Sequence, residues 1–477
     1  MDGAFFADVD GLRVIRDLNP FPVGPSTIEQ MWARRDPDSP AIIDGDRVIT
    51  TGALRERCDA VTRALTALEA PDQPVAWKLD DDLAAVVAFL ATIQAGAIWV
   101  GLNPRATDAE RAHIVDDARA RLVLDALPAD RPATVPGPPP EPGRAGALAY
   151  TSGTTGRPKA AEHIHQQLLY PAAAAIATEG LDASARIGTP LPLSTLNIML
   201  LGPLTALACG GAAVLMSRTD AHGFAAEVDR HGVTRALVVP TIVHDLVAAE
   251  IDPGSLRTLE RLIMGGSGIA RERADHARRM LGVPLVASYG LSEAPSGVAR
   301  MEIGAAGAMP LPGIDLAVDP DGEITLAPET DGPWAHTWQG TRGYRGRPEA
   351  TAALWRGGRL HTGDAGTLDD DGLLLVTGRV SDMINRGGAT IAPAEVERTL
   401  LQLDGVRDAA VFGVDDARLG QIVAAAVVGP VEPDDLTVEV RARLSGYKVP
   451  TVWLVLDELP RNTAGKVDRD ELRSRLA

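Results

Sequence analysis

Short apolar runs and longer helix-spaced runs alternate along most of the chain. The apolar stretch 75–79 precedes helical spacing over 83–95, and this alternation continues, with a further helix expected over 199–209, to an apolar run at 284–288. Strands that alternate with helices of this length form βαβ units and mostly parallel sheets. The pattern therefore predicts an α/β fold, and such sheets bind ligands beyond the carboxyl ends of their strands.

The pattern changes from about residue 313. The segments Asp319-Pro-Asp-Gly322 and Asp369-Asp-Asp-Gly372 are typical of hairpin turns between short strands. After about residue 380 the spacing predicts a smaller α+β unit. We therefore expect an N-terminal domain over 1–380, with αβ-layered, mostly parallel sheets and a small β-barrel-like part. A small α+β domain should follow over 381–477.

Composition narrows the class of protein. A chain of 477 residues is too long for one small core. The net charge of −18 argues against sequence-independent nucleic-acid binding, which needs a basic face.

Two cysteines, Cys58 and Cys209, suit a reducing cytosol rather than a disulfide framework. We see no signal peptide and no apolar stretch of the roughly 20 residues that span a bilayer. The expectation is a cytoplasmic protein with no nucleic-acid partner, and a homodimer stays open.

The segment 150–159 carries the clearest chemistry. It follows the apolar run 147–150, so the loop should lie at a strand end. Its glycines permit unusual backbone angles, consecutive N–H groups can form an anion-binding nest, and its hydroxyls add donors. The residues concerned are Thr151, Ser152, Gly153, Thr154, Thr155 and Gly156, followed by Lys159. Pro158 stands before that lysine and no Ser or Thr follows it, so this is not a Walker A loop. The alternatives are a polyphosphate-binding loop and an ordinary surface loop.

Lysine is scarce in this chain. Lys and Arg together number 46, and the lysines are Lys78, Lys159, Lys448 and Lys466, which leaves 46 − 4 = 42 arginines. A GC-rich genome explains the overall bias. Because lysine and arginine are not interchangeable, a lysine that persists in a loop is a candidate for chemistry. Lys159, Lys448 and Lys466 meet that description, whereas Lys78 lies in an apolar run and is predicted to be structural.

Several later segments, taken with the loop, resemble one family. These are Tyr289-Gly-Leu-Ser-Glu293, Thr362-Gly-Asp364, Gly378-Arg379-Val-Ser-Asp382, Asn385-Arg-Gly-Gly388 and the run from Pro460 to Lys466. From about residue 25 to the C-terminus, their order and spacing are similar to those of the adenylate-forming superfamily. That superfamily comprises acyl-CoA synthetases, peptide-synthetase adenylation domains and luciferases. The chain most resembles an acid–CoA ligase.

The resemblance implies a reaction in two halves. A small carboxylic acid attacks the α-phosphate of ATP, which gives an acyl adenylate and pyrophosphate. A thiol then displaces AMP; it belongs to CoA or to the phosphopantetheine of an acyl carrier protein. The implied cofactors are therefore ATP, Mg²⁺ and CoA or phosphopantetheine as the acceptor.

The resemblance also implies roles for residues on the nucleotide side. Residues 151–159 would cradle the phosphates, Glu293 would coordinate Mg²⁺, and Ser292 would lie near the α-phosphate. The residues expected around adenine are Tyr289, Gly290, Gly265, Gly266 and Ser267. Asp364 would accept the ribose hydroxyls with help from Arg379, although Thr362-Gly-Asp364 taken alone reads as a turn.

Further roles are implied for the C-terminal domain. Lys466 would bridge the carboxylate and the α-phosphate in the first half-reaction. The domain would then swing about a hinge at Asp382 for the thiol step. Gly387 and Gly388 would let the pantetheine arm pass close to the backbone, and Lys448 is assigned to CoA binding.

The expected acyl pocket departs from the family pattern. In Pro190-Leu-Pro-Leu-Ser-Thr-Leu-Asn197, Ser194 or Thr195 stands where many relatives carry a histidine or an aromatic residue. Amino-acid-activating relatives place an aspartate there, so an α-amino acid substrate is disfavoured. Asn197 either binds a polar acyl substituent or caps the next helix.

Four functions follow from these observations. The leading hypothesis is an acid–CoA ligase whose acid, whether fatty, aryl or larger polycyclic, the sequence does not name. The second is a stand-alone adenylation enzyme that loads a carrier protein. The third is a specialised member that performs one half-reaction or passes the adenylate to a nitrogen nucleophile. A non-catalytic nucleotide-binding protein is disfavoured by the intact Lys466, Glu293 and Asp364.

Overall fold

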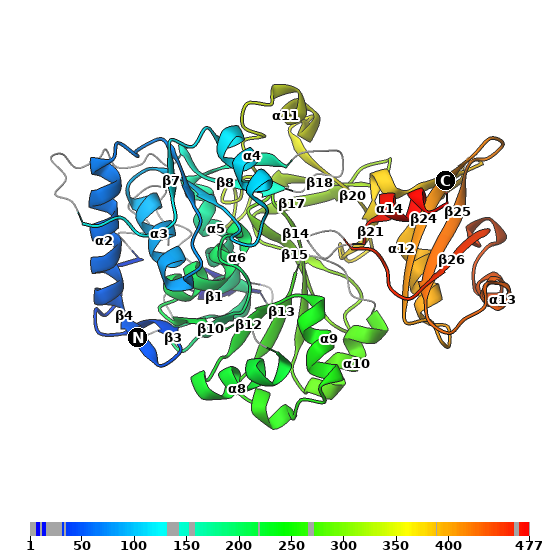
Figure 1. Ribbon diagram of the computed structural model, residues 1–477, viewed down its shortest axis with the longest axis horizontal. Helices are drawn as coiled ribbons and strands as arrows, with labels where there is room; N and C mark the ends of the chain where they lie inside the picture. Colours follow the sequence, from blue (N-terminus) through cyan, green and yellow to red (C-terminus); the bar gives the residue numbers. More distant parts are fainter. Residues whose placement is uncertain are drawn as a thin grey trace. The chain divides into compact units, whose positions relative to one another are not determined.

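The chain divides into two compact units. A computed structural model describes residues 6–9, 12–15, 31–32, 35–130, 143–151, 158–217, 220–265, 271–387, 389–461 and 467–476. The larger unit comprises residues 1–315 and 326–360, and the smaller comprises 316–325 and 361–477 (Figure 1). The border expected after residue 380 lies inside the smaller unit and stays a prediction, because a division by packing does not locate a hinge.

A nine-stranded sheet forms the centre of the larger unit. Its order is β16-β15-β14-β13-β12-β10-β11-β3-β4. The strands are β3 (Pro40–Asp44), β4 (Arg47–Thr50), β10 (Arg186–Thr189), β11 (Ala212–Leu215), β12 (Arg235–Val238), β13 (Arg261–Met264), β14 (Leu285–Leu291), β15 (Ser296–Glu302) and β16 (Met309–Pro310). The run from β14 to β3 is parallel, and β15, β16 and β4 add antiparallel edges.

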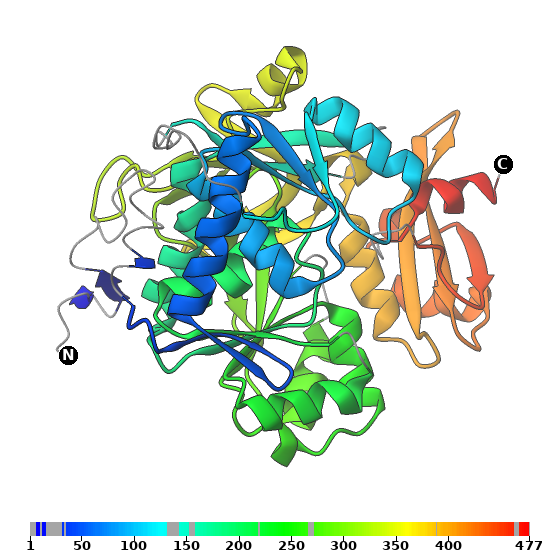
Figure 2. The ribbon, with the colours of Figure 1, turned by 60° about the vertical axis from the view of Figure 1, so that its left-hand side comes forward.

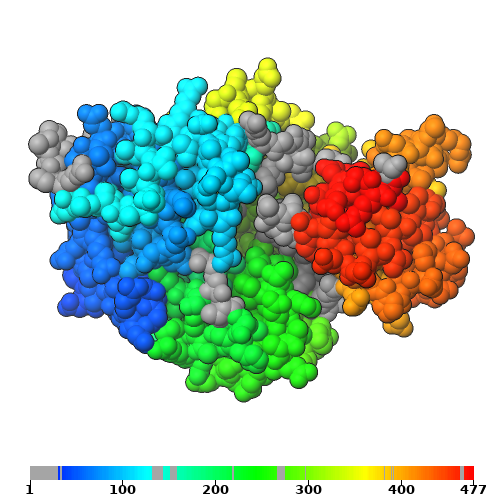
Figure 3. All heavy atoms as spheres, viewed as in Figure 1, coloured from blue at the N-terminus to red at the C-terminus, as the bar shows by residue number. Residues whose placement is uncertain are grey.

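Three helices pack on this sheet. They are α8 (Ala221–His231), α9 (Pro240–Ala248) and α10 (Arg271–Leu281). The short 3-10 turn η2 (Pro253–Leu256) follows α9. Asp220 caps α8 by accepting the N–H of Gly223, and Gly232 ends it with a φ of +61°. Their apolar faces share one core with the strands, and their outer surfaces are the green region of Figure 3.

A second sheet has the order β7-β5-β6-β8-β9. Its strands are β5 (Pro74–Trp77), β6 (Ile98–Gly101), β7 (Leu122–Leu124), β8 (Ala145–Thr151) and β9 (Lys159–Ile164). All pairs are parallel except the β8–β9 hairpin. The accompanying helices are α2 (Thr51–Ala67), α3 (Asp82–Gln94), α4 (Asp108–Ala118) and α5 (His165–Glu179). Helices α2 and α3 lie side by side (Figure 2). One apolar core joins residues of both sheets.

One predicted helix is divided. Residues 199–209 were expected to form a single helix, but α6 (Leu196–Met199), a π-helical turn η1 (Leu200–Leu204) and α7 (Thr205–Ala208) occupy the region. Pro203 lacks the N–H that a regular α-helix needs. The Thr205 hydroxyl donates to the Leu200 carbonyl over 2.8 Å, which supports the wider turn.

A third sheet has the order β17-β18-β20-β19, with β21 paired to β20. Its strands are β17 (Ile314–Val318), β18 (Glu323–Pro328), β19 (Trp355–Arg356), β20 (Arg359–Leu368) and β21 (Leu374–Arg379), and α11 (Pro348–Leu354) precedes β19. Both predicted hairpin turns are confirmed, at 319–322 and 369–372. Gly322 and Gly372 have φ values of +85° and +75°, which glycine adopts without strain.

The fourth sheet has the order β23-β22-β25-β24, and β26 pairs with β25. Its strands are β22 (Ile384–Arg386), β23 (Ala389–Ile391), β24 (Asp408–Asp416), β25 (Gly420–Val428) and β26 (Val452–Leu456). The helices and turns of this region are η3 (Val380–Asp382), α12 (Pro393–Leu401), α13 (Pro433–Arg443), η4 (Gly446–Lys448) and α14 (Arg469–Ser474). Strand residues Val411 and Val423 share a core with Val396 and Leu400 of α12. A separate pair, β1 (Phe6–Val9) and β2 (Leu12–Ile15), is antiparallel.

The predicted fold class is confirmed: mostly parallel αβ-layered sheets, an antiparallel part and a small C-terminal α+β region are all present. Among the helices of the described ranges, none has the length and apolar character needed to cross a membrane.

Candidate active site

The predicted phosphate loop connects the two strands of the β8–β9 hairpin. Thr151 ends β8 opposite Lys159, the first residue of β9. Helix α4 holds the chain on both sides of the loop. The Tyr150 hydroxyl donates to Asp117 Oδ2 over 3.1 Å, and His113 Nε2 lies 3.1 Å from the Pro158 carbonyl oxygen. The predicted residues Ser152, Gly153, Thr154, Thr155 and Gly156 lie outside the described residues.

Tyr344 links the end of this loop to the predicted magnesium ligand. Its hydroxyl donates to Glu293 Oε1 over 2.6 Å, and its ring centroid lies 5.3 Å from Lys159 Nζ. A cation at that distance is attracted to the ring face. Tyr344 also forms an antiparallel bridge with Ala161 in β9. Tyr344 therefore contacts both Lys159 and Glu293, which are far apart in the sequence.

Hydrogen bonds fix the segment around Tyr344 against β9. Arg345 N donates to the Ala160 carbonyl over 2.9 Å, and its side chain pairs with Glu162 over 2.9 Å. Glu162 N donates in turn to the Gly343 carbonyl over 3.0 Å. The segment therefore pairs with β9 like an irregular strand. These backbone contacts fix the orientation of the Tyr344 side chain.

The predicted residues Ser292 and Glu293 follow directly after β14. The Ser292 carbonyl accepts a 2.7 Å hydrogen bond from His163 Nε2, and the Glu293 carbonyl accepts one from Thr341 N over 2.6 Å. Burial lowers the pKa of His163 to about 4, although its bond to Ser292 opposes this shift. His163 is therefore a neutral donor near neutral pH, so that a β9 residue holds the Ser292 carbonyl and Thr341 holds the Glu293 carbonyl.

The adenine candidates lie at the carboxyl ends of adjacent parallel strands. Gly265 follows β13, and its N–H donates to the Val238 carbonyl over 3.3 Å. Tyr289 and Gly290 belong to β14, whose pairing with β15 is irregular between these two residues. This is the edge at which open α/β sheets bind ligands. Gly266 and Ser267 lie outside the described residues.

The predicted acyl segment packs against the end of β6. A Cβ atom on Gly101 would lie 2.1 Å from the Ser194 carbonyl oxygen, so only glycine allows this approach. Thr195 precedes α6 and makes no side-chain cap bond, and Asn197 is the second residue of that helix. The capping alternative for Asn197 is therefore wrong. Its buried Oδ1 has no hydrogen-bond partner within the described ranges.

The ribose candidates face each other across the β20–β21 hairpin. Asp364 pairs in register with Arg379, and Arg379 Nε lies 2.7 Å from Asp364 Oδ1. Asp364 is only 7% exposed. Its N–H donates to the Thr362 hydroxyl over 3.0 Å, and that hydroxyl donates to the Ile324 carbonyl over 2.8 Å. Residues 362–364 thus lie within a strand that contains Gly363 at a φ of +71°.

The remaining candidates belong to the fourth-sheet region. Asp382 ends η3, and its Oδ2 lies 3.9 Å from Arg469 Nη1. Gly387 has a φ of +58° and donates its N–H to the Leu419 carbonyl over 2.7 Å. Lys448 Nζ contacts Glu395 Oε1 over 2.6 Å and Oε2 over 2.7 Å, and this bond raises the pKa of Lys448. Gly388 and Lys466 lie outside the described residues.

Sequence reasoning missed three residues that contact predicted site residues or their immediate neighbours: Tyr344, His163 and Glu323. None belongs to a segment that the sequence singled out for chemistry, except that Glu323 follows the 319–322 turn. Tyr344 is one of only five tyrosines, which is a weak signal. Their partners lie tens of residues away or more, so spacing along the chain does not reveal them.

Comparison with known proteins adds a family and relatives. Residues 29–333 match the family described as AMP-binding enzyme, and residues 395–466 match the AMP-binding enzyme C-terminal domain. A feruloyl-CoA synthase from Amycolatopsis sp. is 33% identical over 93% of this chain and 97% of its own length. A fatty acid–[acyl-carrier-protein] ligase, ScoC, from Streptomyces coeruleorubidus is 29% identical over 93% and 94%.

Solved structures agree with these matches. An o-succinylbenzoate coenzyme A synthetase from Bacillus subtilis, in complex with ATP and a magnesium ion, has a TM-score of 0.81 and 27% identity, covering 93% of this chain and 98% of that one. The amide bond synthetase McbA from Marinactinospora thermotolerans has a TM-score of 0.82 and 26% identity, covering 95% and 100%.

Proposed function

Because this chain belongs to the AMP-binding enzyme family of adenylate-forming ligases, we propose that it is an ATP-dependent acid–CoA ligase. It would join a carboxylic acid to the α-phosphate of ATP with release of pyrophosphate. The thiol of CoA would then attack the acyl carbon, form the thioester and release AMP. The feruloyl-CoA synthase relative, similar over nearly the whole chain, supports this choice of acceptor.

The observation that carries the proposal is the Lys159–Tyr344–Glu293 arrangement. Attack by one anion on a polyphosphate needs charge neutralisation and alignment more than covalent help. Lys159 supplies a positive charge at the end of the loop. The Glu293 carboxylate is a hard oxygen ligand that suits Mg²⁺, and one of its oxygens is already oriented by Tyr344. When bound, Mg²⁺ supplies further charge neutralisation at the phosphates.

Roles for the smaller unit complete the proposal. The Asp364 carboxylate accepts hydrogen bonds from the two ribose hydroxyls, and Arg379 pairs with one of its oxygens. Lys466 places its ammonium group between the acid and the α-phosphate. Residues 381–477 rotate about Asp382 between the half-reactions, with Gly387, Gly388 and Lys448 serving the CoA arm. A few loop residues are sufficient for such a hinge.

Asn197 supports an acid with a polar substituent. Buried amide oxygens normally have a hydrogen-bond donor, since leaving one unpaired costs about 1–3 kcal/mol. The Asn197 oxygen has none among the described residues and lies in the segment expected at the acyl pocket. A hydroxyl or amide N–H on the substrate would satisfy it. The acid class, whether aryl, fatty or polycyclic, is for the assay to decide.

Two alternative acceptors have specific support. The similarity to ScoC favours a carrier-protein phosphopantetheine as the thiol, and the similarity to McbA favours a nitrogen nucleophile. Both alternatives keep the same adenylation half, so they predict the same pyrophosphate release and differ only in the product.

The test is acid-dependent pyrophosphate release from ATP and Mg²⁺ across aryl, fatty and polycyclic acids, with and without CoA. We expect one acid class to be required, CoA to yield an acyl-CoA, and Lys466→Ala to abolish adenylation. Product formed only with a carrier protein or an amine would replace the CoA proposal. No release with any acid, together with thioester formation from a supplied acyl adenylate, would show that only the thiol half is present.

A further inference from the structure

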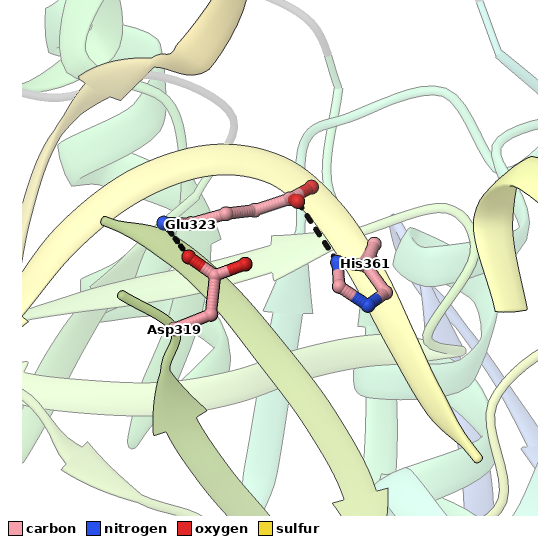
Figure 4. Close-up of side chains that lie close together, drawn as sticks. All are labelled: Asp319, Glu323 and His361. Carbon is pink, nitrogen blue, oxygen red and sulfur yellow. Dashed lines mark hydrogen bonds and ion pairs between the residues drawn. The ribbon is translucent and has the colours of Figure 1, made fainter. Parts of the chain in front are cut away.

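A carboxylate outside the predicted site contacts the residue that precedes the proposed ribose-binding aspartate. Figure 4 shows Asp319, Glu323 and His361 close together, and their ligand atoms all lie within 4.8 Å of one another. Glu323 begins β18, and His361 lies in β20, three residues before Asp364. Both side chains are largely buried, 12% exposed for Glu323 and 15% for His361.

The two oxygens of Glu323 contact two neighbouring residues of β20, one through its backbone N–H and the other through its side chain. Oε1 accepts the N–H of Gly363 over 2.8 Å, and Oε2 accepts Nδ1–H of His361 over 2.8 Å. Gly363 has a φ of +71°, a conformation that glycine adopts readily but does not prefer over others. The Glu323 carboxylate therefore selects one backbone conformation for the residue immediately before Asp364.

The turn that precedes Glu323 fixes this carboxylate in its own place. Asp319 Oδ1 accepts the N–H of Glu323 over 2.8 Å and that of Asp321 over 3.0 Å. The hairpin turn 319–322 thus does more than reverse the chain. It also fixes the Glu323 carboxylate as a hydrogen-bond acceptor beside β20, the strand that contains Asp364.

We infer that Glu323 is a positioning residue for nucleotide recognition, acting through Gly363 on the Asp364 carboxylate. The inference rests on the proposed function, since it assumes that Asp364 binds ribose. Arg379 and Thr362 restrain Asp364 by its side chain and its N–H. Glu323 restrains the peptide that precedes it, so the orientation of the ribose acceptor depends on all three contacts.

The same three side chains lie close enough to hold one cation, but both oxygens of Glu323 and Oδ1 of Asp319 already accept hydrogen bonds. Gly363 N–H and His361 Nδ1–H occupy one oxygen each of Glu323, and backbone N–H groups occupy Asp319 Oδ1. His361 Nδ1 could bind a cation only after losing the proton that it donates to Glu323. Hydrogen bonding alone accounts for the cluster.

The test is ribose discrimination, the ratio of the dissociation constants of 2′-deoxyATP and ATP, measured by calorimetry with Mg²⁺. Binding needs no turnover, so the result stays readable if the acid-activation assay fails. A hydrogen bond to a carboxylate should give the wild type a ratio of roughly 10- to 100-fold. Glu323→Ala should lower that ratio about fivefold or more, because a loosened Asp364 loses most of that bond.

Three variants separate positioning from stability. Glu323→Gln keeps an acceptor for Gly363 N–H and should restore most of the discrimination. In an Asp364→Asn background, Glu323→Ala should change the ratio no further, as expected when one residue acts through the other. Glu329 is the matched control: it also accepts the N–H of a positive-φ glycine, Gly313, over 3.1 Å, but within the described ranges it makes no hydrogen bond or ion pair with residues 361–364. Glu329→Ala should leave the ratio unchanged.

Each other outcome overturns the inference. An unchanged ratio in Glu323→Ala, or an equal drop in Glu329→Ala, would leave Glu323 with only a structural role. A divalent cation that binds the wild type, still binds Glu293→Gln and is lost in Glu323→Ala would make the cluster a metal site. A wild type that binds ATP without ribose discrimination would refute the role of Asp364, whereas acid-dependent pyrophosphate release would then still support the ligase.

Discussion

The proposed phosphate-binding residues of the larger unit and the proposed ribose-binding residues of the smaller unit are held by different kinds of contact. On the phosphate side, in the larger unit, Lys159, Glu293 and Tyr344 come from three segments separated by long stretches of chain. On the ribose side, in the smaller unit, Asp364 and Arg379 are partners in one hairpin. Hairpin register follows from a local turn, whereas distant segments meet only when the whole unit has folded.

This difference teaches which residues a motif can reveal. Asp364 and Arg379 both lie in recognisable segments, and a single turn at 369–372 brings them together. Lys159 and Glu293 also lie in recognisable segments, but the residue that joins them, Tyr344, does not. The phosphate side should therefore depend more strongly on long-range packing, and the following changes test that contrast.

Removing the Glu293 charge should have the largest effect. Glu293→Gln is expected to lower acid-dependent pyrophosphate release about 1000-fold, about 4 kcal/mol, because the metal loses its carboxylate ligand. The measurement is kcat/KM for ATP against Mg²⁺ concentration. Exposed Glu302 on the same sheet provides the control Glu302→Gln. A Mg²⁺ dependence like that of the wild type would exclude Glu293 as the ligand.

Acidification should weaken the larger unit through His163. Burial lowers the pKa of His163 from 6.5 to about 4. Between these two pH values this histidine is protonated in the unfolded chain but neutral in the folded chain. The free energy of unfolding should thus fall by about 3 kcal/mol as pH drops from 6.5 to 4. In urea unfolding, His163→Gln should remove this contribution to the pH dependence of the free energy of unfolding. His222→Gln, at an exposed histidine, should not. An unaltered slope in His163→Gln would contradict the assignment.

Changing Asp364 should give a smaller and more selective loss. Asp364→Asn is expected to lower kcat/KM for ATP about 30-fold, about 2 kcal/mol, as charge-assisted bonds to ribose weaken. The loss should shrink with 2′-deoxyATP, and the Mg²⁺ dependence should stay that of the wild type. Asp370→Asn, in the exposed turn of the same hairpin, is the control. Equal losses with both nucleotides would argue that Asp364 does not contact ribose.

Tyr344→Phe should have the smallest effect. The ring that faces Lys159 remains, and only the hydroxyl that donates to Glu293 is lost, which is worth about 1 kcal/mol or about fivefold in kcat/KM. The change should appear as an altered Mg²⁺ dependence. Tyr170→Phe loses a comparable bond, 2.8 Å to the Pro312 carbonyl, and should affect stability alone. The same Mg²⁺ response in both variants would rule out a specific link between Tyr344 and Glu293.

Much of the fold was predictable because its signals are local. Where apolar periodicity predicted a strand or a helix, over 74–288 and 393–456, it located the element to within a few residues, and Gly322 and Gly372 marked two hairpins. The exception is the helix predicted at 199–209, where Pro203 lies inside a π-helical turn. A proline disrupts regular helix geometry, but whether the chain then breaks, kinks or widens depends on neighbours such as Thr205.

The sequence by itself determined the chemistry that is available: a glycine-rich loop, a scarce lysine at its end, and acids in recognisable segments. Only the tertiary structure decided how these groups are held. The bond of Tyr344 to Glu293, the donation of His163 to Ser292 and the hold of Glu323 on Gly363 each join segments well separated along the chain. Motifs record residue types at fixed spacing, whereas hydrogen-bond partners are set by where the folded backbone brings each atom.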